Sequence, residues 1–372
     1  MDRSVIENQH MRDNQLFGRM VGVWPKQTKF VKYSMRTVTS FLIDFSIQFQ
    51  VAQVVVHYSF DVLTDQLPFL VLGSAILLKQ YNYILNEAKL NELLNGIVTD
   101  WLTERSEDEI KILKTYYKMT VFFSSFYKVT IICCMLTFVL LPTVPPIMDV
   151  IAPLNQSRPR ILVYPSYYFV DEQQYYYPIL AHMVLSSFIL AFVFTACDLN
   201  YIHVVQHACA LFAISGHRFK HAADDIDAYK GNDGRRPVDE SYAKVRRSIE
   251  AHKRAIEQVV SRLDTCNALA TMEKCLAYFT YCGFAMAQLV HLFFLTIMGQ
   301  FVINSNEEIF RTICEARWYN CSTRTQLLYL LVLRKCLSPH KLTGGGFVSM
   351  NLDSFVQILK ASVSYYTVLK SS

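Results

Sequence analysis

Six stretches of the chain are apolar over a length that can cross a lipid bilayer as a helix. They cover residues 38–58, 63–85, 119–141, 178–202, 276–303 and 347–369. A transmembrane helix needs about 20 mostly apolar residues. A weaker helical pattern spans residues 250–275, but it carries Asp264, Glu273 and Lys274. The pattern therefore predicts an all-α, polytopic membrane protein.

The last of these stretches carries polar residues on one side. At about 100° per residue, one stripe of the helix holds Asp353, Gln357, Lys360, Ala361, Ser364 and Val368, and the other side holds Leu352, Phe355, Val356, Leu359, Val363 and Tyr366. Polar groups in a membrane face protein or water, because lipid offers them no hydrogen-bond partner. The stripe indicates either a helix packed into a bundle through small and hydroxyl side chains, or a helix that lines an aqueous pore. The residues alone leave both interpretations open.

The composition agrees with a membrane protein. Hydrophobic residues make up 52% of the 372 residues and charged residues only 18%, whereas soluble domains are about 25% charged. The N-terminal residues are polar and of mixed charge, without an apolar run behind a basic start, so we expect no cleaved signal peptide. No cysteine lies between residues 142 and 177, and a disulfide framework is not expected there.

Basic residues near the spans predict the orientation of the chain, because cytoplasmic loops are enriched in Lys and Arg. Residues 1–37 carry seven of them and residues 204–262 carry eleven, whereas residues 142–177 carry only Arg158 and Arg160. This distribution predicts a cytoplasmic N-terminus and an outer loop at 142–177. The sequon Asn-Gln-Ser that begins at Asn155 makes that residue a candidate glycosylation site in the outer loop.

The basic segment 304–346 is also predicted to be cytoplasmic, and a seven-crossing topology follows. This topology divides the chain into a cytoplasmic segment 1–37, helices one to four at 38–203, a cytoplasmic helical extension at 204–262, helices five and six at 263–303, a cytoplasmic anchor at 304–346 and helix seven at 347–372. Helix five is the weakest of these spans because of its charged residues. The alternative topology has six crossings and places 304–346 outside, where the sequon at Asn320 could be glycosylated.

Several motifs resemble those of insect odorant receptors. The strongest is the closing stretch GGFVSMNLDSFVQILKASVSYYTVLK, which is similar to the C-terminal signature of that family and its finish of the type ILK-S-SY-aromatic-T-L. Weaker similarities are HACALFAISGHRF at 207–219, AHKRAI at 251–256, QLVHLFF, NSNEE and CEARWYN. The similarity covers most of the chain, although the short fifth segment departs from the family pattern.

The resemblance implies a seven-helix receptor with a cytoplasmic N-terminus and an external C-terminus, in the plasma membrane of olfactory sensory neuron dendrites. It implies a small volatile odorant as ligand and assembly with co-receptor subunits into a tetrameric, odorant-gated cation channel surrounded by membrane lipid. In that family the final helix lines the pore. By similarity, Val368 falls at the hydrophobic gate, with Gln357, Ala361 and Ser364 below it on the same face. A hydrophobic constriction gates by dewetting.

The odorant pocket of that family lies in the outer half of the bundle, between helices two, three, four and six. With the predicted orientation, the resemblance implies a lining of Phe69 and Gly73 on helix two, Cys134, Thr137 and Phe138 on helix three, His182, Met183 and Ser186 on helix four, and Tyr278, Tyr281 and Phe284 on helix six. Aromatic side chains stack on ring-containing odorants, and Met adapts to irregular shapes. Packing in the bundle core is the alternative role for each residue.

Other function classes have less support in the residues. A heptahelical G-protein-coupled chemoreceptor is the main alternative, but the chain has no DRY or NPxxY motif, and the basic residues place its N-terminus inside. A secondary transporter would show inverted repeats, which the sequence lacks. No Walker loop, Gly-x-Ser-x-Gly elbow or HExxH motif indicates an enzyme, and we expect no cofactor and no nucleic-acid partner. The pairs His203–His207 and His217–His221 have a spacing that suits a metal, but no hydrolase motif accompanies them and no metal site is expected.

Asp44 lies inside the first apolar run. An acidic residue within a span indicates a polar contact or a functional site. We expect a polar contact within the bundle, with Gln48, Gln50 and Gln53 as its partners.

Overall fold

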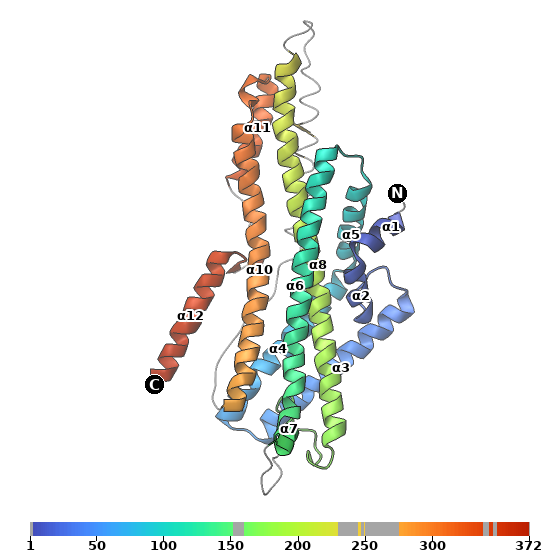
Figure 1. The fold of residues 1–372 in the computed structure, drawn as a ribbon, viewed down its shortest axis with the longest axis vertical. Coiled ribbons are helices and arrows are strands. Elements are labelled where there is room, and N and C mark those ends of the chain that lie inside the picture. Colours follow the sequence, from blue (N-terminus) through green and yellow to red (C-terminus); the bar gives the residue numbers. More distant parts are fainter. Residues whose placement is uncertain are drawn as a thin grey trace.

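The computed structural model describes residues 3–151, 160–229, 245–246, 249, 275–337, 342–344 and 348–371, and these residues are almost entirely helical (Figure 1). The long helices are α3 (Lys29–Val56), α4 (Phe60–Leu85), α6 (Glu107–Leu140), α8 (Tyr176–Tyr229), α10 (Cys275–Glu315) and α12 (Leu352–Ser371). The shorter ones are α1 (Arg3–His10), α2 (Arg12–Met20), α5 (Glu87–Leu102), α7 (Val144–Ile151) and α11 (Thr323–Cys336), with the 3-10 turns η1 (Leu141–Thr143) and η2 (Trp318–Asn320). Strands β1 (Thr343–Gly344) and β2 (Val348–Ser349) form a short antiparallel pair. The predicted all-α fold is confirmed.

Helix α8 forms the centre of the bundle. It packs against α2, α3, α4, α6 and α10, and no residue between Ser186 and Phe219 is exposed. A helix that is apolar on all sides is normally buried on all sides. Between Met183 and Phe219, α8 is mostly apolar, and Asp198, Asn200 and His203 are polar but also buried, so the other helices pack around this part.

Helices α6 and α10 flank α8 over most of its length, as Figure 1 shows. Aromatic side chains fill the space between them. The rings of Tyr127 and Phe294 have centroids 5.1 Å apart, and those of Phe123 and Phe301 are 5.5 Å apart. Their edge-to-face arrangement is the one that aromatic pairs favour. These contacts join α6 to α10 alongside the central helix.

The end of the bundle that carries α11 is held by buried hydrogen bonds. The hydroxyl of Tyr329 on α11 donates to the carbonyl oxygen of Phe219 on α8 at 2.7 Å. Asn306 of α10 donates from Nδ2 to the carbonyl oxygen of Cys336 at 3.0 Å. The short helix α11 therefore packs onto the extended ends of α8 and α10.

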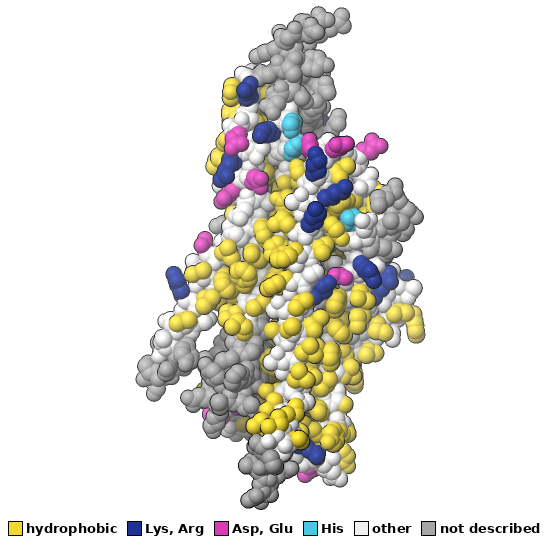
Figure 2. Space-filling view, viewed as in Figure 1, with side chains coloured by type: hydrophobic (Ala, Val, Ile, Leu, Met, Phe, Trp, Pro, Cys, Tyr) yellow, Lys and Arg dark blue, Asp and Glu magenta, His cyan; other side chains and the backbone are white. Residues whose placement is uncertain are grey.

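Five of the described helical segments are long and apolar enough to cross a membrane, namely α3, α4, α6 continued through α7, α8, and α10 from Gln288. They correspond to the predicted apolar runs at 38–58, 63–85, 119–141, 178–202 and 276–303. Figure 2 shows hydrophobic side chains spread over the lower part of the molecule, whereas most charged side chains lie toward the end that carries α11. The predicted fifth crossing, which precedes residue 275, lies outside the described residues. The choice between six and seven crossings therefore stays a prediction.

The N-terminal segment folds back onto the bundle through polar contacts. Asn14 on α2 donates from Nδ2 to Oδ1 of Asn200 on α8 at 3.1 Å. Lys32 and Arg36 at the start of α3 both bind Glu87 at the start of α5. Burial raises the pKa of the Glu87 carboxyl, but its hydrogen bonds to the two cations outweigh this effect and hold the pKa below its usual value. The carboxylate is therefore charged at neutral pH and ties α3 to α5.

A second polar group, which we call the polar cluster, lies where α4, α6, α8 and α10 meet. Asp198 of α8 pairs with Lys79 of α4 and accepts a hydrogen bond from the hydroxyl of Tyr127 on α6. The Nδ1 atom of His291 on α10 lies 3.2 Å from the carboxylate and 3.1 Å from the Tyr127 hydroxyl. Asp198, Tyr127 and His291 are buried. Each helix contributes one polar side chain to a contact that lipid could not replace.

The substitution Asp198→Asn should lower the free energy of unfolding by about 3–5 kcal/mol, because it leaves the Lys79 ammonium without its buried anion. The measurement is equilibrium unfolding of the purified protein in detergent. Asp108→Asn is the matched control, since the pair of Asp108 and Lys111, 2.9 Å apart, is exposed to solvent. Exposed pairs contribute little, so the control should unfold like the unmodified protein. Equal losses in the two variants would contradict the role assigned to burial.

Candidate ligand-binding site

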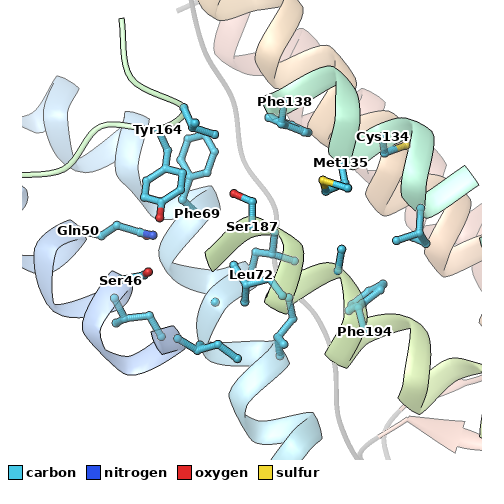
Figure 3. Close-up of a pocket in the computed structure, with 18 of the residues that line it drawn as sticks. Ser46, Gln50, Phe69, Leu72, Cys134, Met135, Phe138, Tyr164, Ser187 and Phe194 are labelled. Carbon is cyan, nitrogen blue, oxygen red and sulfur yellow. The ribbon is translucent and has the colours of Figure 1, made fainter. Parts of the chain in front are cut away.

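A cavity with a volume of about 140 Å³ lies inside the bundle. Helices α3, α4, α6 and α8 each contribute four residues to its lining, α10 contributes Gln288, and the segment between α7 and α8 contributes Val163 and Tyr164 (Figure 3). Within each of the four helices these residues recur at spacings of three and four, which places them on one face. The residues from α8 precede Asp198, so the cavity lies on the Tyr176 side of the polar cluster.

The wall between α3 and α4 depends on a glycine. A Cβ atom added at Gly73 would lie 3.1 Å from Cγ1 and 3.3 Å from Cδ1 of Ile47. Both distances are shorter than ordinary van der Waals contacts, so any larger residue would push the helices apart or displace Ile47. Glycine lets the two backbones approach closely at this point.

Residues 161–168 of the segment between α7 and α8 pack against the bundle. Gln66 of α4 is fully buried and donates from Nε2 to the carbonyl oxygen of Pro165 at 2.7 Å. The amide nitrogen of Tyr167 donates to the carbonyl oxygen of Phe49 on α3 at 3.1 Å. These two bonds attach the segment to α3 and α4, and they place the side chain of Tyr164 in the cavity wall.

The lining is mostly apolar, with Ser46, Gln50, Tyr164, Ser187 and Gln288 as its polar residues, and none of the described lining residues is charged. Near the polar cluster, the ring of Phe194 borders the cavity and lies 4.3 Å from the ring of His291, centroid to centroid. The ammonium group of Lys79 lies 4.5 Å from the centroid of the same ring. An apolar pocket with a few polar groups suits a small neutral molecule. A ligand in contact with Phe194 would also touch a side chain that packs on the polar cluster.

Four residues expected in the odorant pocket line this cavity: Phe69 and Gly73 on α4, and Cys134 and Phe138 on α6. Thr137 does not line it. This residue is exposed, and its hydroxyl donates to the carbonyl oxygen of Cys133 at 2.9 Å. The face of α6 that meets the cavity therefore passes through positions 134 and 138, and position 137 points away from it.

The residues expected from helix four lie beside the cavity lining and not in it. His182 lies 2.8 Å from the hydroxyl of Tyr168, while Met183 and Ser186 are fully buried. The α8 residues that line the cavity are Ser187, Leu190, Ala191 and Phe194. The lining residues of α8 therefore begin just beyond Ser186, and the role of the three expected positions in an odorant pocket stays a prediction.

Several expected residues lie where the structure does not describe them. Tyr278, Tyr281 and Phe284 belong to α10, but their side chains are outside the described set, and among the described residues of α10 Gln288 meets the cavity. Asn155, the candidate glycosylation site, also lies outside the described residues.

The sequence did not point to α3 as a cavity wall. Its lining residues are Ile43, Ser46, Ile47 and Gln50. Their spacing of three, one and three residues was a usable signal, because it places two apolar and two polar side chains on one face of the helix. The position of Gln50 in the sequence favours a contact with Asp44 instead.

Helix α12 leaves the bundle soon after it begins, as Figure 1 shows. Phe355 packs edge-to-face on Phe293 of α10 with ring centroids 5.6 Å apart. Gln357, Ala361 and Ser364 are exposed, and the side chain of Val368 is outside the described set. The apolar side of α12 thus meets α10 at its start, and the described part of its polar stripe faces away from the chain.

The turn before α12 packs directly against a glycine of α10. A Cβ atom at Gly299 would lie only 1.8 Å from the carbonyl oxygen of Met350. Met350 is buried, and its amide nitrogen donates to the carbonyl oxygen of Leu342 at 2.7 Å. Any side chain at Gly299 would therefore displace the backbone that leads into α12.

Comparison with known proteins identifies the family. The family model described as "7tm Odorant receptor" matches residues 59–272 and 265–363, which is well over half of the chain. The chain belongs to the odorant receptor family. It is accordingly a multi-pass membrane protein, and the family suggested by the closing stretch is confirmed.

Sequence relatives of this odorant receptor match over short segments. The odorant receptor coreceptor of Drosophila melanogaster is 28% identical over 89 residues, which is 24% of this chain and 18% of that protein. Odorant receptor 22c of Drosophila melanogaster is 29% identical over 92 residues, or 25% of this chain and 23% of that protein. The matches therefore span about a fifth of the length of the relatives.

The similarity in fold extends over the whole receptor. The insect olfactory receptor OR5 from Machilis hrabei, solved in complex with eugenol, superposes with a TM-score of 0.77 at 13% identity and full coverage of both chains. A second structure of that receptor gives a TM-score of 0.68 at 12% identity with 99% coverage of each chain. The chain therefore has the fold of the insect olfactory receptors.

The substitution Gly299→Ala should lower the free energy of unfolding, because a methyl group cannot occupy the space of the Met350 carbonyl and the turn must move. Gly216→Ala on α8 is the matched control, since its Cβ would meet nothing closer than 3.7 Å. Alanine is favoured over glycine in a helix by about 1 kcal/mol, so the control should be as stable as the unmodified receptor or more stable. Equilibrium unfolding in detergent compares the two variants. A Gly299→Ala protein with an unchanged free energy of unfolding would contradict the close contact.

Proposed function

We propose that this chain is the odorant-binding subunit of a ligand-gated cation channel that it forms with co-receptor subunits. The observation that carries the proposal is the uncharged cavity between α3, α4, α6 and α8 in a chain with the odorant receptor fold. The solved receptor from Machilis hrabei binds eugenol, a small aromatic molecule. A cavity of this size and polarity suits a ligand of the same kind.

The exposed final helix supports assembly with other subunits. Asp353, Gln357, Lys360 and Ser364 are exposed on α12, yet polar groups at membrane depth need protein or water beside them. In the proposed channel this stripe lines the permeation path, with Gln357, Ala361 and Ser364 below the gate at Val368. The outer side of α11, where Leu327 and Leu331 are exposed, would pack against neighbouring subunits in a cytoplasmic anchor. We propose a tetramer in the plasma membrane of olfactory neuron dendrites, with lipid around the remaining helices.

A physical route joins the cavity to the final helix. Phe194 borders the cavity and packs on His291 of α10. Farther along α10, Gly299 contacts the backbone of Met350, which leads into α12. A ligand that binds more tightly to one arrangement of these helices shifts the population toward it. We propose that odorant binding favours the arrangement in which α12 opens the gate.

Cells that express this chain together with a co-receptor should show odorant-evoked cation current during whole-cell recording with a broad odorant panel. Cells with either subunit alone should not show the same odorant response. Cells with this chain alone would lack the complete pore, and cells with the co-receptor alone would lack the cavity of this chain. The current should persist when G-protein signalling is blocked. A response that needs G proteins would support the heptahelical G-protein-coupled alternative, and silence of a surface-expressed complex would overturn the proposal.

The substitution Ala191→Phe should abolish the odorant-evoked current, because a phenyl ring at this lining position fills much of a cavity of about 140 Å³. Leu185→Phe on the same helix is the control, since Leu185 is 50% exposed and does not line the cavity. Concentration–response curves and surface labelling of both variants make the comparison. If the two variants lost the response equally, the cavity would not be the ligand site.

A further inference from the structure

Three side chains in the cavity wall each carry a polar atom that finds no hydrogen-bond partner among the described residues. They are Ser46 and Gln50 on α3, and Tyr164 in the segment between α7 and α8, with exposed fractions of 1%, 4% and 7%. The atoms that remain unpaired are Ser46 Oγ, Gln50 Oε1 and the Tyr164 hydroxyl oxygen. The hydroxyl groups of Ser46 and Tyr164 lie near each other, but their geometry is not that of a hydrogen bond. Buried polar groups are nearly always paired, so three unpaired atoms that meet in one cavity favour a ligand that carries a polar group.

The three side chains share one end of the cavity. Figure 3 shows the Tyr164 hydroxyl, the Gln50 amide and the Ser46 hydroxyl directed toward the same region, while Phe69 and Leu72 lie beside them and Met135 and Phe138 lie across the cavity. All seven residues line the cavity. A bound molecule would therefore meet these three polar groups at one end and mostly apolar side chains along the rest of its surface, where Ser187 and Gln288 are the polar exceptions among the described residues.

The chemistry of the three groups defines what the ligand must carry. An amide oxygen only accepts a hydrogen bond, whereas the hydroxyls of Ser46 and Tyr164 can donate or accept. A ligand hydroxyl can donate to Gln50 and accept from Tyr164 or Ser46 at the same time. The ligand hydroxyl can also pair with Gln50 if the amide group is flipped, because it can accept a hydrogen bond from the amide nitrogen. An ether oxygen cannot donate, and a hydrocarbon leaves all three groups unpaired.

The charge of the lining and the size of the cavity restrict the class of ligand further. None of the described residues that line the cavity is charged, so a carboxylate or an ammonium group would be buried beside them without a partner ion, which is strongly unfavourable. An apolar cavity of about 150 Å³ holds one benzene molecule. The cavity here is about 140 Å³, which suits one six-membered ring with a short substituent.

We propose that this receptor selects small neutral alcohols and phenols, with the ligand hydroxyl held by Gln50, Tyr164 and Ser46 and the ring packed between Phe69, Met135 and Phe138. This inference rests on the proposed odorant-receptor function and specifies its ligand class. A buried polar group left unpaired by the wrong ligand lowers affinity. The alcohol should therefore act at a concentration about 10- to 100-fold lower than its ether or hydrocarbon counterpart.

The test uses three probes with the same number of non-hydrogen atoms: benzyl alcohol, anisole and ethylbenzene. The full chain is expressed with the co-receptor, surface expression is verified, and the half-maximal concentration of each probe is measured alongside the broad panel. The unmodified receptor should respond to benzyl alcohol at about 10- to 100-fold lower concentration than to the other two. Equal potencies of the three probes, or responses only to other panel members that lack a hydroxyl, would overturn the inference.

Two substitutions test the residues themselves. Gln50→Met and Tyr164→Phe remove the polar atoms at nearly constant volume, and each should reduce the preference for benzyl alcohol while the responses to ethylbenzene remain. Tyr168→Phe is the matched control, because the Tyr168 hydroxyl binds His182 at 2.8 Å and does not line the cavity. Its preference should equal that of the unmodified receptor. An unchanged preference in both test variants would show that another group recognises the hydroxyl.

These outcomes test the proposed ligand class separately from the proposed receptor function. If no odorant in the panel evokes a current from a surface-expressed complex, the proposed function fails and the ligand class fails with it. If odorants evoke current but the alcohol has no advantage, the receptor function stands and only the ligand class is overturned.

Discussion

The ion pair between Asp198 and Lys79 is the contact on which the arrangement of the bundle depends. It lies inside the protein and joins α8 to α4, and the same carboxylate accepts a hydrogen bond from Tyr127 on α6 and lies 3.2 Å from His291 on α10. A charge at this depth is tolerated only with its partners in place. The four helices must therefore keep a mutual arrangement that satisfies Asp198.

This requirement also shapes the cavity. Phe194 lies one turn of α8 before Asp198, borders the cavity and packs on both His291 and Lys79. The end of the cavity near the polar cluster is therefore defined by a side chain that cannot move without disturbing that cluster. Packed cores switch between discrete arrangements more readily than they deform gradually. A ligand that displaces Phe194 would act on the contact that holds the helices together.

The final helix differs from α8, since it has few contacts with the other described residues of the chain. Its start is held by the close contact of the Met350 backbone with Gly299 and by the contact of Phe355 with Phe293. Beyond that point most of its described side chains are exposed, including Gln357 and Ser364. A helix with a polar stripe gains stability in a membrane only from protein or water at that face. The chain is thus tightly packed around α8 and left open at α12, as a subunit of a larger assembly would be.

The sequence by itself determined the local features: the apolar runs that became α3, α4, α6, α8 and α10, and the polar stripe of α12. These depend on hydropathy and on the period of a single helix, which a sequence displays directly. Only the tertiary structure decided which faces meet. The pairing of Lys79 with Asp198 and the bond from Gln66 to Pro165 join residues 119 and 99 positions apart, and the approach of α3 to α4 requires Gly73. Distant contacts of this kind brought Ser46, Gln50 and Tyr164 into one cavity, because no periodicity within one helix encodes how two helices cross or where a loop folds in.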